Sequence, residues 1–146
     1  MSFFEKYKAC IDEKISSTKR SIVVIKENNR RYELVNKGSW VITKFFVEGC
    51  ITKKEGEKGC EAVLIAMKDK NKSKGFFVEL KGMSVRAALK QVKSAFEKTK
   101  NDLKDHQLYG RIVPSEYKRT KFLDAEQGAL IKLFKSYGGD LNNKRK

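Results

Sequence analysis

The segment from Gly75 to Gly82 reads Gly-Phe-Phe-Val-Glu-Leu-Lys-Gly and limits the possible folds more than any other part of the chain. Its apolar and aromatic residues favour a β-strand, in which alternate side chains point to opposite faces. Phe77, Glu79 and Lys81 therefore share one face. Because an unpaired buried charge is costly, two charges on one face of an apolar strand indicate a partner, a ligand or a catalytic role.

The remaining sequence predicts an α/β fold with a central mixed β-sheet flanked by helices. Apolar residues at helical spacing, one stripe preceded by the capping pattern of Ser2 and Glu5, predict helices. Runs of β-branched and aromatic residues predict strands, with the first two in a hairpin and the fourth and fifth in another. Helices are expected over residues 2–16, 84–104 and 124–137, and strands over 22–25, 31–35, 40–47, 60–66, 75–81 and 108–113.

Length and charge indicate one domain that binds a polyanion. We expect a single domain over residues 1–141 of the 146 and a frayed basic tail at 142–146. Thirty-three Lys and Arg residues against eighteen Asp and Glu give a formal net charge of +15. This excess favours nucleic acid as a partner, although solubility alone is the simpler interpretation. No apolar run approaches 18 residues, so no membrane partner is expected.

The cysteines and the single histidine argue against zinc. Cys10, Cys50 and Cys60 are odd in number and lack C-x-x-C spacing, and His106 is the only histidine. Neither a zinc site nor a disulfide framework is expected, which favours a reducing, cytoplasmic setting. Cys50 and Cys60 are interpreted as small core or loop-flanking residues.

Three glutamates are candidates for a metal site. Glu48, Glu61 and Glu79 lie where predicted strands can converge, and Mg²⁺ prefers one or two carboxylates with water and phosphate completing its shell. Lys81 would stand beside such a cation and stabilise charge developing on phosphorus. Together these residues outline a phosphodiester hydrolysis site that uses Mg²⁺ or Mn²⁺.

The Glu-x-Lys motif alone is weak, because it also occurs at Glu116 and Lys118. The copy at Glu79 is the stronger candidate, because a strand that begins with an acidic residue precedes it and an amphipathic helix follows it. Two plain alternatives remain open. Glu79 and Lys81 could pair on the exposed face of an edge strand, and Glu61 could simply begin a strand.

The pattern of Glu61, Glu79-Leu80-Lys81 and a following helix with Gln91 resembles the core of the PD-(D/E)xK nuclease superfamily. Residues 40–113 are similar to small prokaryotic proteins of that group, through Val47–Cys50, Gly59–Glu61, Phe77–Gly82, Ala88 and Gln91. The resemblance implies a restriction-endonuclease-like core, with Glu61 and Glu79 as metal ligands, Lys81 as a catalytic residue and Gln91 as a supporting one. It implies a Mg²⁺-dependent endonuclease acting on DNA.

The sequence departs from this family in the acids that precede the motif. Both Glu48 and Glu61 are glutamates where aspartate is usual, and the extra methylene moves the carboxylate. The alternative is therefore a catalytically inactive protein of nuclease fold that binds nucleic acid or a partner. A glutamate near the N-terminus, Glu5 or Glu13, is a further candidate for the site.

Basic side chains are predicted to supply contacts to DNA phosphates, which are independent of sequence. The aromatic residues Trp40, Tyr32 and Tyr109 are interpreted as core or sheet-face residues rather than platforms on which bases stack. Cleavage specificity and oligomeric state stay open, a homodimer being one possibility. The predicted phosphate-binding residues are Arg86, Lys90 and Lys93 on the long helix and Lys70, Lys72 and Lys74 in a basic turn.

Overall fold

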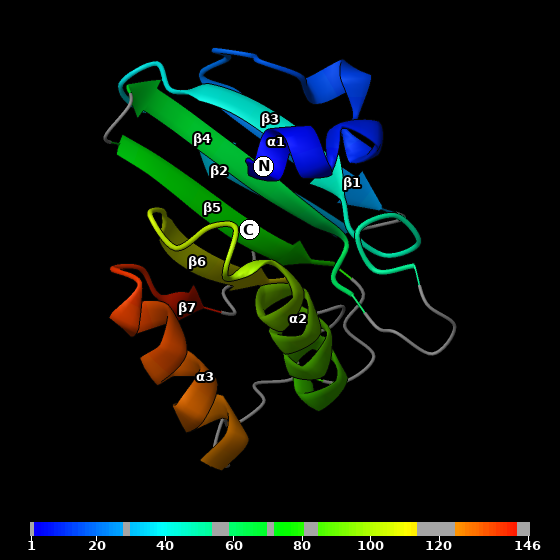
Figure 1. The fold of residues 1–146 in the computed structure, drawn as a ribbon, viewed down its shortest axis with the longest axis vertical. Coiled ribbons are helices and arrows are strands. Elements are labelled where there is room, and N and C mark those ends of the chain that lie inside the picture. The colour runs from blue at the N-terminus through cyan, green and yellow to red at the C-terminus, as the bar shows by residue number, and fades with distance from the viewer. Residues whose placement is uncertain are drawn as a thin grey trace.

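The computed structural model describes residues 2–27, 30–53, 59–69, 72–80, 85–113 and 125–142, without the side chains of residues 85 and 126. It confirms a mixed α/β architecture, with the six predicted strands and the two later helices in the predicted order (Figure 1). The elements are α1 Phe3–Lys6, η1 Lys8–Cys10, η2 Glu13–Ile15, β1 Ile22–Glu27, β2 Arg30–Val35, β3 Val41–Phe46, β4 Ala62–Asp69, β5 Lys72–Glu79, α2 Val85–Thr99, β6 Gln107–Ile112, α3 Ala125–Ser136 and β7 Leu141–Asn142.

The main sheet has five strands in the order β3-β4-β5-β6-β7, so β5, which carries Glu79, is its middle strand. β3, β4 and β5 pair antiparallel, whereas β6 runs parallel to β5 and β7 parallel to β6. A parallel neighbour requires a crossover connection, and α2 lies in the segment between β5 and β6. β1 and β2 form a separate antiparallel hairpin, as predicted.

The sheet separates two apolar cores, one on each face. On the helix face, Phe77 packs with Phe96 of α2 and Phe134 of α3, and the residues of this cluster also include Phe3 and Cys10 from the N-terminal segment. On the hairpin face, residues such as Leu64 and Val78 pack with those of β1 and β2. Figure 1 shows the helices on one side of the sheet and the β1–β2 hairpin on the other.

The prediction of one helix over residues 2–16 is wrong. Only the short α1, η1 and η2 form there, because the segment pairs with the edge of the sheet instead of with itself. Ile11 bridges Phe45, and the backbone N–H of Asp12 donates to the carbonyl of Lys44 at 2.9 Å. The Asp12 carboxylate also pairs with the Lys44 ammonium group at 3.2 Å. These contacts cover β3, which would otherwise be an exposed edge.

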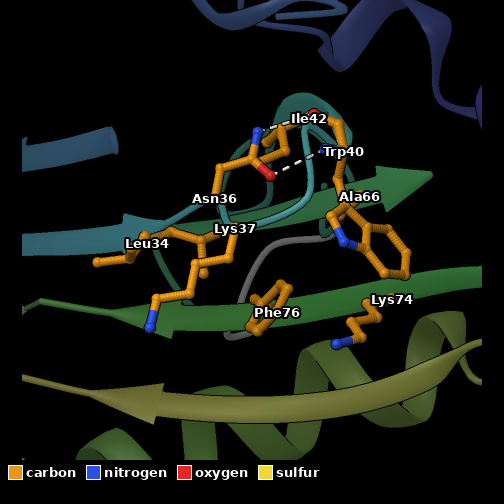
Figure 2. Close-up of a pocket in the computed structure, with 9 residues that line it drawn as sticks. Leu34, Asn36, Lys37, Trp40, Ile42, Ala66, Lys74 and Phe76 are labelled. Carbon is orange, nitrogen blue, oxygen red and sulfur yellow. Dashed lines mark hydrogen bonds between the residues drawn. The ribbon is translucent and has the colours of Figure 1, made fainter. Parts of the chain in front are cut away.

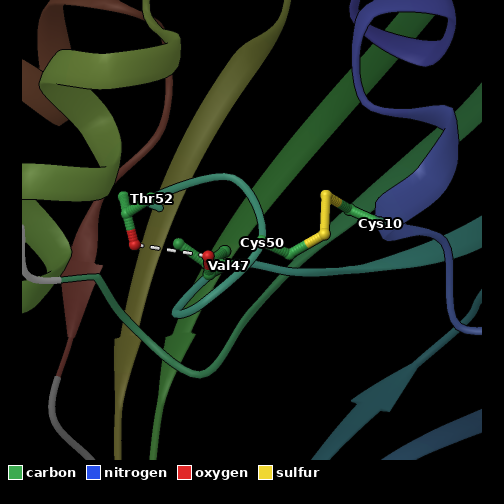
Figure 3. The surroundings of a disulfide bond; sticks show 4 residues. All are labelled: Cys10, Val47, Cys50 and Thr52. Carbon is green, nitrogen blue, oxygen red and sulfur yellow. Dashed lines mark hydrogen bonds between the residues drawn. A yellow bond between two sulfur atoms is a disulfide. The ribbon is translucent and has the colours of Figure 1, made fainter. Parts of the chain in front are cut away.

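The expectation that the cysteines stay unpaired is also wrong. Cys10 and Cys50 form a disulfide bond with a Cα–Cα distance of 5.8 Å, which joins the N-terminal segment to the turn after β3 (Figure 3). Within that turn, the Thr52 hydroxyl donates to the carbonyl of Val47. Cys60 is a free thiol and is buried, as predicted. Residues 40 apart in sequence could not be paired from spacing alone.

The last strand of the sheet includes Asn142, the first residue of the predicted tail. Leu141 and Asn142 form β7 beside β6, so Asn142 belongs to the sheet rather than to a frayed tail, and residues 143–146 lie outside the described part. Gly139 permits this approach, because a Cβ atom there would collide with the carbonyl oxygen of Leu108. Of the helices in the described residues, none has the length and apolar character needed to span a membrane.

Candidate active site

Glu79 is a buried carboxylate at the end of the central strand. Its residue is 1% exposed, and it shares the helix face with Phe77, two positions earlier in β5. The backbone N–H of Leu80 donates to Glu79 Oε1 at 3.0 Å, and the N–H of Val113 donates to the Glu79 carbonyl at 2.9 Å. The alternative of an exposed pair on an edge strand is therefore wrong for Glu79.

Glu61 lies beside Glu79 at the same end of the sheet. It directly precedes Ala62, whose antiparallel partner is Val78, so Glu61 and Glu79 flank this pair on adjacent strands. Glu61 itself lies directly before β4, and its neighbour Cys60 packs in the helix-face core. Glu61 is half-buried.

The Cys60 thiol, directly before Glu61 in the chain, is buried and has a shifted pKa. Burial raises the pKa of Cys60 well above its usual value, and the charges of Glu79 and, more weakly, Glu61 raise this pKa further. Cys60 is 0% exposed, and its thiol donates to the carbonyl of Ala62 at 3.6 Å. Both carboxylates therefore disfavour ionisation of this thiol.

Glu48 does not join the other two carboxylates in a three-ligand cluster. Its backbone N–H donates to the carbonyl of Cys60 at 3.3 Å, which places its main chain next to the site, but its side chain is exposed. Across the described ranges, no group of three or more His, Cys, Asp or Glu side chains is placed to hold a metal ion. Glu5 and Glu13 are likewise exposed.

Of the two other proposed catalytic residues, Lys81 and Gln91, the structure describes only Gln91. Lys81 lies outside the described residues, two positions beyond Glu79. Gln91 is half-buried on α2, where it borders the buried stripe of Ala88 and Ala95. α2 packs against β5 and β6, so the helix that carries Gln91 covers the strand that carries Glu79.

The predicted phosphate-binding residues fall on two different faces of the molecule. Arg86, Lys90 and Lys93 are exposed on α2 at helical spacing, so they form one row on the helix layer. Lys74 is not in a turn but in β5, and its ammonium group lies 4.9 Å from the centre of the Trp40 ring on the hairpin face. Lys72 begins the same strand, and Lys70 lies outside the described residues.

The aromatic residues also differ from one another. Tyr32 is 5% exposed and packs in the hairpin-face core, as predicted. Trp40 and Tyr109 are only partly buried at the margin of that core, as sheet-face residues. Trp40 lines a hollow that the sequence did not reveal, because its walls come from four separate strands.

Comparisons with protein-family models, with curated proteins and with solved structures find no match to this chain.

Proposed function

We propose that this protein is a metal-dependent phosphodiester hydrolase that acts on DNA. The observation that carries the proposal is the buried carboxylate of Glu79 at the end of β5, with Glu61 directly before the neighbouring strand β4 at the same end of the sheet. Keeping an acid at 1% exposure inside an apolar core is costly unless it is paired, hydrogen-bonded or bound to a cation. The Glu-x-Lys motif and the basic row on α2 support a phosphate ester as substrate.

The residues present fit a divalent cation held by two carboxylates. Mg²⁺ is commonly bound by one or two carboxylates together with water and substrate phosphate, and Glu61 and Glu79 supply that number. The register of β4 and β5, in which Ala62 pairs with Val78, places both residues at one end of the sheet and supports a shared location. When bound, such a cation would supply Lewis-acid activation of the phosphoryl group and of a nucleophilic water.

The chain's own residues have separable roles in this proposal. Glu61 and Glu79 hold the cation, and the ammonium group of Lys81 stabilises negative charge that develops on the phosphate. Gln91 supports the site from α2. The exposed cations Arg86, Lys90 and Lys93 bind neighbouring phosphates without reading sequence.

The fold supports the same function by resemblance. Similarity to the PD-(D/E)xK superfamily implies a mixed sheet flanked by helices. In this chain β4, which Glu61 precedes, is followed by β5, which ends at Glu79, and then by α2. Fold alone does not determine function, so the proposal depends on the two carboxylates and on Lys81.

A cleavage assay tests the proposal. Purified protein is incubated with supercoiled plasmid, linear duplex and single-stranded DNA in the presence of Mg²⁺ or Mn²⁺. We expect cutting that EDTA abolishes, and a loss of at least about 100-fold in Glu79→Gln and in Lys81→Ala, as for removal of a catalytic acid or base. Glu97→Gln is the matched control, because Glu97 is an exposed carboxylate on α2 paired with Lys100.

Two results would contradict the hydrolase. Wild-type protein that binds DNA but cuts none of the substrates with either metal would favour the inactive nucleic-acid-binding protein of nuclease fold. Cutting that survives unchanged in both Glu79→Gln and Lys81→Ala would mean that other residues, or a contaminant, perform the reaction.

A further inference from the structure

A hollow of about 160 Å³ lies on the hairpin face, opposite the carboxylates (Figure 2). Its walls come from β2, the chain between β2 and β3, and strands β3, β4 and β5, and it is lined by Trp40 and Phe76 with Lys37 and Lys74. An engineered apolar cavity of about 150 Å³ holds benzene, so this volume suits one planar ring. None of the described lining residues is acidic.

The wall that carries Trp40 is held rigidly. Asn36 is 9% exposed, and its side-chain amide donates to the carbonyls of Arg20 and Trp40 at 3.0 and 2.8 Å. Its side-chain oxygen accepts from the backbone N–H of Trp40 at 2.9 Å, as Figure 2 shows. The residue before β3 is thus fixed from both sides, and little conformational entropy is lost when a ligand binds.

Aromatic rings and cations lie close together in this hollow and on the hairpin face next to it. The Lys74 ammonium group lies 4.9 Å from the Trp40 ring centre and 5.7 Å from that of Tyr109. Tyr109 stacks on Phe76 with ring centres 4.8 Å apart, and the Arg111 guanidinium lies 5.3 Å from the Tyr109 ring. Basic groups beside aromatic rings form the combination that binds the bases and phosphates of single strands.

A second hollow of about 260 Å³ adjoins the first and shares Trp40 and Lys74 with it. Lys72, Asp105 and Gln107 are among its other lining residues. Trp40 and Lys74 therefore stand between two hollows, so a ligand longer than one nucleotide can pass from one to the other. This arrangement favours a strand over a free mononucleotide.

We propose that this surface binds single-stranded nucleic acid, with one base against Trp40 in the first hollow and phosphates on Lys37, Lys74 and Lys72. A base within a duplex has both ring faces stacked on its neighbours, so a duplex cannot offer a base to this hollow. The surface is separate from the carboxylates, because Lys74 and Glu79 are five residues apart in β5, about 17 Å along a strand, and point to opposite faces. Binding here does not depend on the proposed hydrolysis.

Trp40 provides the probe, because it is the only tryptophan of the chain. A short oligothymidylate is titrated into the full-length protein in EDTA, which prevents metal-dependent cutting, and tryptophan fluorescence is recorded. We expect saturable quenching that weakens as salt is added. Matched duplex and thymidine monophosphate should bind at least about tenfold more weakly, since the first offers no free base and the second reaches only one hollow.

Variants separate this surface from non-specific charge attraction, with anisotropy of a labelled strand as the readout. We expect Trp40→Leu to weaken binding at least about tenfold, and Lys74→Gln to weaken it several-fold and reduce the salt slope by about one. Lys132→Gln removes the same charge from an exposed position on α3 and should change affinity less than twofold. Trp40→Phe keeps a ring and should retain most of the affinity, which guards against misfolding of Trp40→Leu.

The proposal is overturned if Lys74→Gln and Lys132→Gln weaken binding equally, or if duplex or mononucleotide quenches Trp40 fluorescence at the same concentration as the strand. Glu79→Gln should bind the strand as wild type does in EDTA. This holds whether or not Glu79 is required for cutting, so failure of the hydrolase and failure of this surface give different results.

Discussion

The two ends of β5 carry opposite charges on opposite faces of one sheet. Glu79, near the end, is buried at 1% exposure beneath the helix layer, whereas Lys74, near the start, is half-buried among partly exposed rings on the hairpin face. Strand alternation alone separates them, since residues of even and odd number point to different sides. The central strand β5 thus contributes side chains to a buried region on one face of the sheet and to a partly exposed region on the other.

The difference follows from what covers each face. α2, α3 and the N-terminal segment together pack over the helix face, where aromatic residues such as Phe77 and Phe96 are fully buried. The hairpin face is covered by a sheet of only two strands, which leaves hollows beside Trp40. A closed face suits a positioned carboxylate, and a partly open one suits an extended ligand.

The largest expected effect on stability contrasts neighbouring residues on the two faces. Phe77 is 0% exposed and contacts Phe96 and Phe134, so Phe77→Ala should lower the free energy of unfolding by about 3–5 kcal/mol. Phe76 is 8% exposed and stacks on Tyr109, so Phe76→Ala should lose less, about 2–3 kcal/mol. Urea unfolding of both variants measures this. Equal losses would mean that the faces are equally well packed.

The disulfide provides the next contrast, because it fastens the N-terminal segment on the helix face only. Cys10 and Cys50 are separated by 40 residues, and a loop of that length predicts stabilisation of about 4 kcal/mol at most. A reducing agent should therefore lower the unfolding midpoint of wild type and leave Cys10→Ala/Cys50→Ala unchanged. Intact-mass measurement verifies the bond, and a midpoint insensitive to reduction would contradict its structural role.

The smallest expected effect tests the pH dependence of stability at His106. His106, in the connection from α2 to β6, is half-buried, and burial lowers its pKa below 6.5 while Asp105 partly opposes this. The unfolded chain then binds a proton more readily, so the histidine's contribution to stability is complete above pH 6.5 and declines as the pH falls through its folded pKa. Urea midpoints of wild type and His106→Gln, compared above and below that pH, should differ more on the acid side. If the urea midpoints of the two proteins changed with pH in parallel, His106 would not be the group responsible.

Much of the architecture could be predicted because its signals are local. The alternation around Phe77 and Glu79, the hairpin of β1 and β2, and the apolar stripe of α2 each specify an element without knowledge of its neighbours. The helix over residues 2–16 failed because Asp12 and Ile11 pair with β3, and tertiary contacts outweigh helical spacing.

The candidate site was predictable only in part. Glu61 and Glu79 precede and end strands that a turn joins, so their adjacency follows from hairpin register. The Cys10–Cys50 bond and the hollow beside Trp40 depend on residues brought together from distant segments. Lys74 was assigned to a turn because lysines surround it in sequence, although β5 begins at Lys72.

Calorimetric titration with Mn²⁺ tests most directly whether the two ends of β5 have different chemistry. We predict saturable binding to wild type that Glu79→Gln abolishes and Lys74→Gln leaves unchanged. Absence of binding to wild type, or equal binding by Glu79→Gln, would contradict a metal site at the buried carboxylate.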